Sequence, residues 1–280
     1  MKLKTLALSF ALAMSAIGSA QAAAVISGFN SNTLARNDDG STGVVNLGFT
    51  ANFFGLSFDT VYVNNNGNVT FDQSLITYTP FDLTSTSRQI IAPFFADVDT
   101  RVAGEAVTYG SGSYEGRTAF GVNWVDVDYY SSNIEHTARN TFQLILVDRS
   151  DVGAGDFDIV FNYDKIEWEA GTASGSDENG LGGDSARAGF SNGTGNSGTF
   201  FELEGSAVNG ALLDGGPNAL ISSSLNSNVL GRYIFSARSG DVIVTPDPDP
   251  TPNDVPEPAT LALLGIGLVG LGAMRSRRKQ

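Results

Sequence analysis

The chain has 280 residues, among them 33 Gly and 18 Phe, and it contains no Cys and a single His. The lack of Cys excludes disulfides, zinc–thiolate sites and a cysteine nucleophile. The formal net charge is −14, and the stretch 23–256 holds 29 acidic and 10 basic residues, which excludes the basic surface that a nucleic-acid partner requires.

The first 22 residues have the three-part pattern of a signal peptide. Lys2 and Lys4 give a positive start, residues 6–17 are an apolar run, and small residues surround the junction Ala22–Ala23. We therefore expect a signal helix, cleavage by signal peptidase between Ala22 and Ala23, and export across the inner membrane. A buried N-terminal helix is the alternative.

Between residues 25 and 240, short segments alternate apolar and polar residues and are separated by Gly and Asn, which is typical of strands. Segments 61–63 and 69–71 flank Asn64-Asn65-Asn66-Gly67-Asn68 and predict a hairpin, because Asn-Gly accepts the positive φ of hairpin turns. Further alternating segments predict strands at 120–124, 142–147, 157–163 and 233–235.

These segments predict an all-β fold, an antiparallel β-sandwich or barrel-like domain over residues 23–240. Alternating aromatics are best explained as core residues, with a carbohydrate-stacking platform as the alternative. Residues 85–91 have the composition of one helical turn. Residues 171–199 are rich in Gly and Ser and predict an irregular functional loop or a mobile insertion.

Catalysis is poorly supported by the sequence. Segment 189–193 reads Gly-Phe-Ser-Asn-Gly and fits a nucleophile elbow, which needs a strand before it, a helix after it and a downstream His. Poor helix formers follow it, and His136 lies upstream in a polar stretch that suggests an exposed loop. We therefore expect no catalytic residue and no enzymatic activity. A glycosidase-like carboxylate pair stays open, because sequence gives no distance between carboxylates.

Two pairs of aspartates are candidate oxygen ligands for a cation. Asp97 and Asp99, and also Asp126 and Asp128, stand two residues apart and would share one face of an extended strand. Calcium accepts six to eight oxygen ligands in loose geometry, which makes Asp97 and Asp99 the candidate calcium ligands. There is no EF-hand loop, and a solvated acidic face explains the same residues. No other cofactor is expected.

The composition changes twice near the C-terminus. Residues 241–255 form a linker rich in Pro and Asp, extended at about 3.1 Å per residue. Residues 259–274 are an uninterrupted apolar run, about 24 Å long as a helix, and predict a single short transmembrane helix. Four cations follow at once and are expected to stay in the cytoplasm. These cations are Arg275, Arg277, Arg278 and Lys279.

The segment Val255-Pro256-Glu257-Pro258-Ala259, with the apolar run and basic cluster behind it, resembles a PEP-CTERM sorting signal, here residues 256–280. The resemblance implies recognition by a membrane-embedded exosortase, processing at Pro256, Glu257 and Pro258, and transient contact with the inner membrane. It also implies delivery to the cell surface or extracellular matrix of a Gram-negative, exopolysaccharide-producing bacterium. A plain anchor behind a Pro-rich stalk is the alternative.

Five segments spread over residues 50–238 resemble a nidogen-like (NIDO) domain. They are 91–101 (IAPFFADVDTR), 140–146 (NTFQLIL), 161–168 (FNYDKIEW), 186–191 (ARAGFS) and 231–235 (GRYIF). The resemblance implies an extracellular, non-enzymatic module of matrix and adhesion proteins. It also places Asp97 and Asp99 in a hallmark motif, which could equally be a structural turn in which Arg101 pairs with a carboxylate.

Taken together, these features predict a secreted or cell-surface adhesion or extracellular-matrix protein of a biofilm. Its partner would be an extracellular polysaccharide or a matrix protein. One alternative is an exported hydrolase acting on matrix polysaccharide, which would need a cleft with convergent carboxylates. The other is a structural surface protein that self-associates through an exposed sheet edge.

Overall fold

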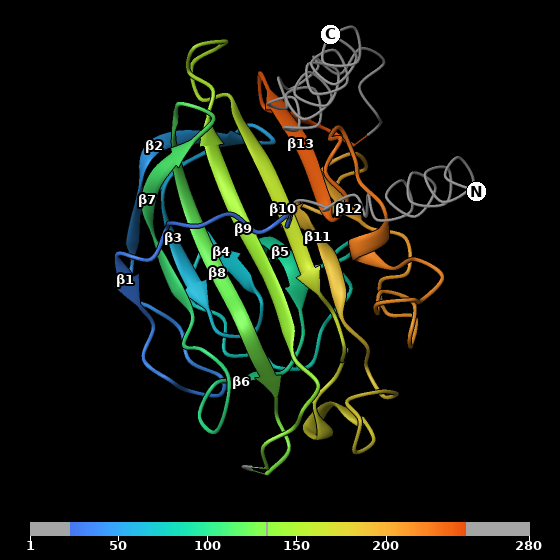
Figure 1. The fold of residues 1–280 in the computed structure, drawn as a ribbon. Helices are drawn as coiled ribbons and strands as arrows, with labels where there is room; N and C mark the ends of the chain where they lie inside the picture. Colours follow the sequence, from blue (N-terminus) through green and yellow to red (C-terminus); the bar gives the residue numbers. More distant parts are fainter. Residues whose placement is uncertain (1–22, 133, 245–280) are drawn as a thin grey trace, which may run out of the picture. The chain divides into compact units, whose positions relative to one another are not determined.

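The computed structural model of the chain describes residues 23–132 and 134–244, which form two packed antiparallel sheets (Figure 1). This arrangement confirms the all-β, sandwich-like prediction. The predicted signal helix and transmembrane helix lie outside the described residues. Within those residues, no helix is long and apolar enough to cross a membrane.

The larger sheet has the strand order β1-β7-β8-β9-β10-β13-β14, with β6 paired to β8. Its strands are β1 (Asn32–Thr33), β6 (Val98–Asp99), β7 (Thr108–Tyr114), β8 (Arg117–Tyr129), β9 (Asn140–Asp148), β10 (Phe157–Lys165), β13 (Arg232–Arg238) and β14 (Asp241–Ile243). The smaller sheet has the order β12-β11-β5-β4-β3-β2. Its strands are β2 (Val45–Phe53), β3 (Leu56–Asn64), β4 (Asn68–Thr70), β5 (Gln89–Phe95), β11 (Arg187–Asn192) and β12 (Phe200–Glu202). The two short 3₁₀ helices are η1 (Thr172–Ser174) and η2 (Leu220–Ser222).

The alternating aromatics fill the space between the sheets. Trp124 of β8 stacks on Phe142 of β9 with ring centroids 5.1 Å apart, and Phe94 of β5 lies 5.3 Å from Phe142. All three rings are buried, so the core interpretation is confirmed and these rings offer no platform to carbohydrate. Burial of such aromatics supplies much of the hydrophobic stabilisation of a sandwich.

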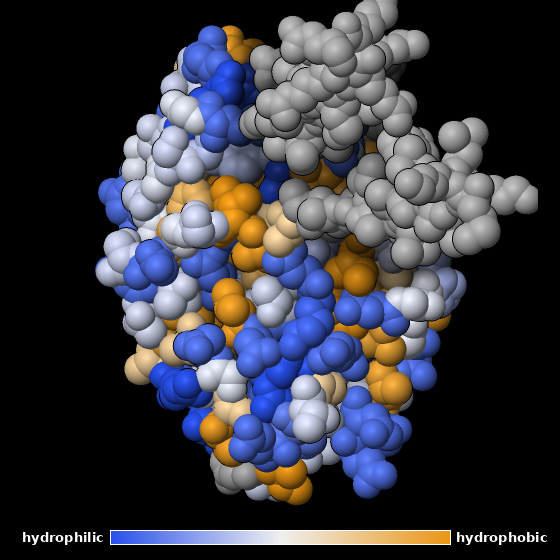
Figure 2. Space-filling view, in the orientation of Figure 1, coloured by the Kyte–Doolittle hydropathy of each residue, from blue (hydrophilic) through white to orange (hydrophobic). Residues whose placement is uncertain are grey.

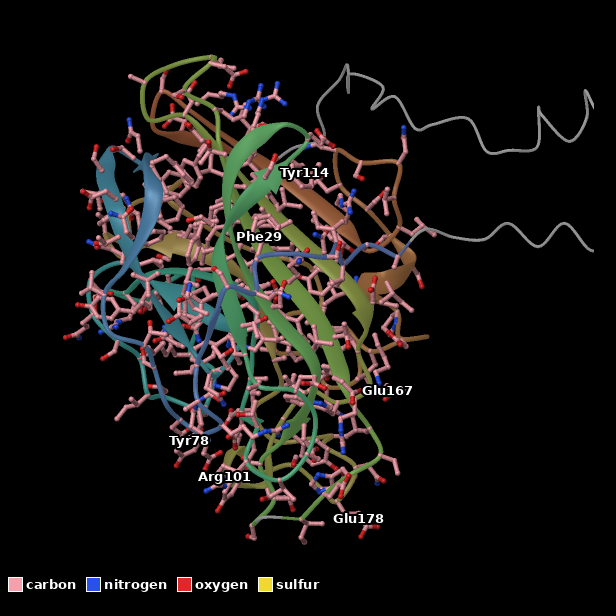
Figure 3. All side chains as sticks on the ribbon, turned by 60° about the vertical axis from the view of Figure 1, so that its left-hand side comes forward. Phe29, Tyr78, Arg101, Tyr114, Glu167 and Glu178 are labelled. Carbon is pink, nitrogen blue, oxygen red and sulfur yellow. The ribbon has the colours of Figure 1, made fainter. Side chains whose placement is uncertain are left out.

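The outer face of the larger sheet is also partly apolar, and the start of the described chain covers it. Phe29 packs with Ile145 and Val147 of β9 and with Tyr114 of β7, and Figure 3 shows Phe29 and Tyr114 over this face. Gly121 makes room for the ring, because a Cβ at this position would lie 2.3 Å from Phe29 Cγ. This cover explains why β9 is apolar on both faces.

Some local predictions were wrong. Residues 89–91, which were expected in a helical turn, begin β5, because Ile90 and Ile91 are buried between β4 and β11. The stretch 171–199 contains β11, which pairs with β5 and β12. Tertiary pairing outweighs local propensity in both cases. In addition, β14 pairs with β13, so the folded part continues into the segment expected to be linker.

Apolar residues on the surface lie in small groups separated by hydrophilic ones, as the view in Figure 2 shows. The exposed large apolar side chains come from scattered segments, for example Val44, Ile76, Val152 and Val208. Single exposed apolar residues are normal on a soluble surface. The candidate site is therefore formed by polar groups.

Candidate functional site

Three aspartates from two distant segments meet near one end of the sandwich. Asp38 and Asp39 lie in the loop between β1 and β2, and Asp97 lies in the connection between β5 and β6. One carboxylate oxygen from each residue lies within 4.8 Å of the other two. We call these residues the Asp cluster. Arg101, which borders the cluster, and Tyr78 lie toward the same end of the molecule in Figure 3.

Asp97 is buried and Asp38 and Asp39 are half-buried, and the cluster is short of hydrogen-bond donors. Asp97 is only 1% exposed, and neither its Oδ2 nor Asp38 Oδ1 has a hydrogen-bond partner among the described residues. Burial, followed by the charges of Asp38, Asp39 and Asp99, raises the pKa of Asp97 to about 8. Burial and the charge of Asp99 raise the pKa of Asp38 to about 6. The arrangement therefore disfavours ionised carboxylates that have no cation beside them.

Of the two predicted calcium ligands, Asp97 belongs to the Asp cluster, whereas Asp99 is bound by Arg101. Asp99 Oδ1 accepts hydrogen bonds from the backbone N–H of Arg101 at 2.9 Å and from its Nε at 3.0 Å, and Oδ2 accepts one from Nη2 at 2.7 Å. The same Nη2 lies 3.1 Å from Asp38 Oδ2. The alternative prediction, a turn with Arg101 paired to a carboxylate, is confirmed. Asp99 lies in β6, and Asp97 lies just before this strand.

The β3–β4 hairpin, confirmed at its predicted position, holds the cluster in place. The side-chain amide of Asn66 donates to Asp39 Oδ1 at 2.9 Å, and its oxygen accepts from the backbone N–H of Val98 at 2.9 Å. The amide of Asn65 donates to the backbone carbonyls of Asp38 and Val98. The hairpin turn therefore joins the two segments that supply the carboxylates. The sequence predicted the turn but not this use of its side chains.

Asp126 and Asp128, the second predicted pair, lie in different surroundings. Between Trp124 and Val127 the register of β8 shifts, and Asp126 has φ of +52°. A bulge of this kind changes the face on which the following side chain lies. Asp126 therefore pairs with Lys165 at 3.0 Å and is half exposed, whereas Asp128 is buried.

Asp128 has a full set of partners. Its carboxylate accepts from the backbone N–H groups of Tyr129 at 2.9 Å and His136 at 3.1 Å. His136 Nδ1 lies 2.9 Å from Oδ1, and Arg139 Nη1 lies 3.3 Å from Oδ2. The imidazole also stacks on Tyr129 with ring centroids 3.9 Å apart. The prediction of an exposed loop histidine was therefore wrong, because this buried carboxylate and the aromatic ring draw His136 inward.

Segment 189–193, which matches the nucleophile-elbow pattern, does not form such an elbow. Ser191 is 1% exposed and lies within β11, where its strand neighbours cover it. A turn, not a helix, follows the strand and leads to β12. His136 is engaged by Asp128. Neither the accessible hydroxyl nor the base that acyl transfer needs is present at this segment.

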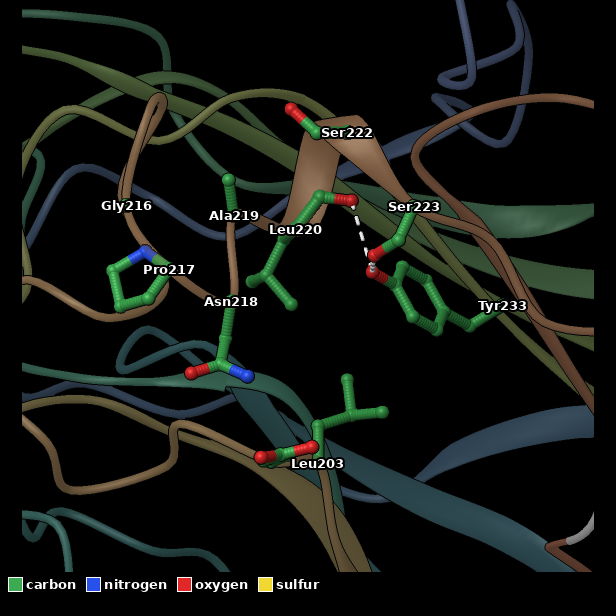
Figure 4. A pocket seen from close by; sticks show the side chains of 10 residues that line it. Leu203, Gly216, Pro217, Asn218, Ala219, Leu220, Ser222, Ser223 and Tyr233 are labelled. Carbon is green, nitrogen blue, oxygen red and sulfur yellow. Dashed lines mark hydrogen bonds between the residues drawn. The ribbon is translucent and has the colours of Figure 1, made fainter.

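A pocket of about 390 Å³ lies beside η2 and the start of β13 (Figure 4). The Tyr233 hydroxyl donates to the Leu220 carbonyl at 3.1 Å and lies 2.5 Å from Ser223 Oγ. Glu204 is the only carboxylate among the lining residues. Glycoside hydrolysis ordinarily uses two opposed carboxylates, so this pocket lacks the pair that the hydrolase alternative requires.

Two family profiles match the sequence. The nidogen-like domain matches residues 59–239, and the PEP-CTERM protein-sorting motif matches residues 254–279. Both resemblances drawn from the residues are thereby confirmed. The sorting motif implies export, exosortase processing and a surface location in a Gram-negative bacterium.

Several curated proteins are similar to the chain. Alpha-tectorin of Mus musculus is 37% identical over 229 residues, which cover 73% of this chain and 10% of the tectorin, and that of Homo sapiens is 36% identical with the same coverage. Nidogen of Drosophila melanogaster is 28% identical over 223 residues, covering 70% of this chain and 15% of the nidogen. The chain thus spans about a tenth of the length of the tectorins. No solved structure matches it.

Proposed function

The chain belongs to the nidogen-like domain family, and from this premise we propose that it is a non-enzymatic adhesion or extracellular-matrix protein of a bacterial biofilm. One observation carries the proposal: a single chain joins a nidogen-like domain to a PEP-CTERM sorting motif. The motif directs the protein to the cell surface, and the similarity to tectorin and nidogen indicates a matrix module. Its partner would be an extracellular polysaccharide or a matrix protein.

The catalytic features considered above gain no support from the geometry. Ser191 is inaccessible, His136 is held by Asp128, and the pocket beside Tyr233 presents a single carboxylate. The domain is a β-sandwich with polar loops at its ends. Loops placed on a rigid scaffold commonly carry recognition. We therefore assign binding to the loops and the sheet surface.

Self-association through a sheet edge receives less support. The edge strands β1, β12 and β14 have two or three residues each, which is too short for extended pairing. The long edge strand β2 has a register shift between Asn46 and Ala51, and Asn52 N–H donates to the Gly155 carbonyl. Short edges and bulged edges disfavour strand addition from a second molecule. Sedimentation velocity of the purified protein should therefore show a monomer.

The sorting step is tested by expressing a tagged chain in a host with an exosortase, beside a variant that lacks residues 256–280. The intact chain should reach the cell surface or matrix, and its mature mass should lack residues after about Pro258. The truncated chain should fail to be retained at the surface. A mature product that keeps Arg275 to Lys279 would contradict the processing step.

Binding and hydrolysis are separated by mixing the mature protein with isolated matrix polysaccharide. Cosedimentation without release of reducing sugar ends supports adhesion. Release of reducing ends that grows with time and protein concentration would instead favour the hydrolase. If protease treatment of the matrix abolishes binding, the partner is a matrix protein rather than polysaccharide.

A further inference from the structure

We propose that Asp38, Asp39 and Asp97 bind a calcium ion that joins the β1–β2 loop to the β5–β6 connection. The first support is distance. One oxygen from each carboxylate lies within 4.8 Å of the others. Two oxygens bound to the same calcium ion at 2.3–2.6 Å can be at most about 5 Å apart. The three carboxylates are therefore close enough to share one ion.

Asp97 supplies an independent observation. Its side chain is 1% exposed, and Oδ2 accepts no hydrogen bond from the described residues. A buried carboxylate with an unpaired oxygen is costly, whereas one that coordinates a metal is compensated. Asp38 Oδ1 is buried and lacks a partner in the same way. A cation bound by these two carboxylates would compensate their burial.

The local charge balance favours a divalent ion. Three carboxylates meet in the Asp cluster, and that of Asp99 shares the guanidinium of Arg101, the positive group beside them, with Asp38. The Arg101 guanidinium hydrogen-bonds Asp99 and lies 3.1 Å from Asp38 Oδ2. No hydrogen bond joins it to Asp97 in the described part of the chain. With all four carboxylates ionised, the single charge of Arg101 leaves a net charge of about −3, so a divalent cation favours the ionised form of the cluster.

The donor set selects the kind of cation. Carboxylate oxygens suit calcium and magnesium, whereas zinc and copper favour sites with nitrogen or sulfur ligands. Magnesium demands near-octahedral geometry, while calcium accepts irregular sites and fills its shell with water. Extracellular calcium modules commonly bind in the range of about 10⁻⁴–10⁻³ M. We expect an affinity in this range.

The site is shaped around Asp97. Gly171 borders the carboxylate, and a Cβ at this position would lie 2.2 Å from Asp97 Oδ2. The φ of Gly171 is −87°, which any residue adopts. Ala at this position therefore adds a methyl group beside Asp97 without straining the backbone. Gly171→Ala should therefore displace the carboxylate while keeping its charge. This variant separates ligand geometry from net charge.

The test is thermal unfolding of the mature protein in EDTA, in 10 mM CaCl₂, in 10 mM MgCl₂ and in NaCl of matched ionic strength. Calcium at 10 mM, about 10–100 times the expected dissociation constant, should raise the midpoint by about 3–10 °C. Calorimetric titration with CaCl₂ should give one site per chain. In Asp97→Asn the thermal shift should disappear, and the affinity in the titration should fall at least about tenfold.

Asp59→Asn is the matched control, because Asp59 lies exposed on β3 and the substitution makes the same charge change. It should keep the full calcium response, and Gly171→Ala should lose most of it. The proposal is overturned if calcium acts no more strongly than matched NaCl. It is also overturned if Asp97→Asn and Asp59→Asn respond equally. Neither result depends on whether the protein binds matrix.

Discussion

Asp97 and Asp128 are both buried aspartates, each 1% exposed, and both belong to the region where β6 pairs with β8. Asp128 is surrounded by donors, namely two backbone N–H groups, an imidazole and the guanidinium of Arg139. Asp97 has two further carboxylates as neighbours, and its Oδ2 has no donor among the described residues.

The neighbours of a buried carboxylate determine whether it stabilises the fold. A buried carboxylate that meets donors on several sides is a structural element, because removing it would leave those donors unpaired. A buried carboxylate that meets other carboxylates destabilises the fold until a cation joins it. The same residue type, at the same burial, is therefore expected to respond to substitution with opposite signs.

The largest expected effect is at Asp128. Among the described residues, Asp128→Asn leaves the buried guanidinium of Arg139 with only the exposed Glu135 as an acidic partner. The free energy of unfolding should therefore fall by about 3 kcal/mol. Urea unfolding measures this change. Asp126→Asn, which breaks only a half-exposed pair with Lys165, should cost less than about 1 kcal/mol. Equal costs for the two variants would contradict the structural role of Asp128.

The same substitution at Asp97 should act in the opposite direction. In EDTA at pH 8, Asp97→Asn should raise the free energy of unfolding by about 2 kcal/mol, since it replaces a buried negative charge by an amide that can donate to Asp38 or Asp39. Urea unfolding in chelator measures it. A loss of stability comparable to that of Asp128→Asn would show that Asp97 is a structural partner after all.

The pH dependence of the metal-free protein sharpens the comparison. The pKa values of Asp97 and Asp38 are raised in the folded state to about 8 and about 6. A raised folded-state pKa gives stability that is fully present below the unfolded value and is lost as pH rises through the folded value. In EDTA, stability should therefore fall between pH 5 and pH 8. The charged groups that set this behaviour are Asp38, Asp39, Asp97, Asp99 and Arg101.

Asp97→Asn should flatten the decline, and Asp59→Asn should not change it. Unfolding in urea at pH 5, 6, 7 and 8 gives the comparison. A wild-type protein whose stability rises over this range would contradict the assigned direction of both pKa shifts.

The smallest effect is expected at Arg101. Arg101→Gln removes the positive group that lies 3.1 Å from Asp38 Oδ2, so calcium should bind about fivefold more tightly, while the metal-free protein becomes less stable. Calorimetric titration measures the affinity. Weaker calcium binding in this variant would mean that Arg101 positions the ligands instead of competing with the ion.

Regular alternation made much of the fold predictable. Alternation of apolar and polar residues predicted the strands around Trp124, Phe142 and Phe161. The Asn-Gly turn predicted the hairpin at Asn64–Asn68. β7 could not be found this way, because its Gly110 and Gly112 serve to admit Ser31 and Phe29 from the start of the chain. The packing of this first segment on the sheet depends on the tertiary structure. The local alternation of apolar and polar residues does not reveal it.

The site was predictable only in part. Asp97 was a candidate ligand from its spacing to Asp99, but its companions Asp38 and Asp39 are far away in sequence and meet it only through the sheet topology. The sequence shows an acidic loop, Asn-Asp-Asp-Gly, at 37–40. It does not show that this loop lies beside Asp97. The bulge that turns Asp126 away from Asp128 is equally invisible to strand periodicity.

A crystal structure grown in millimolar CaCl₂, with anomalous data collected at long wavelength, tests the contrast between the two aspartates most directly. We expect an anomalous peak about 2.3–2.6 Å from oxygens of Asp38, Asp39 and Asp97, and none at Asp128. A map with no peak at the Asp cluster, or one in which Arg101 has turned to pair with Asp97, would contradict the account.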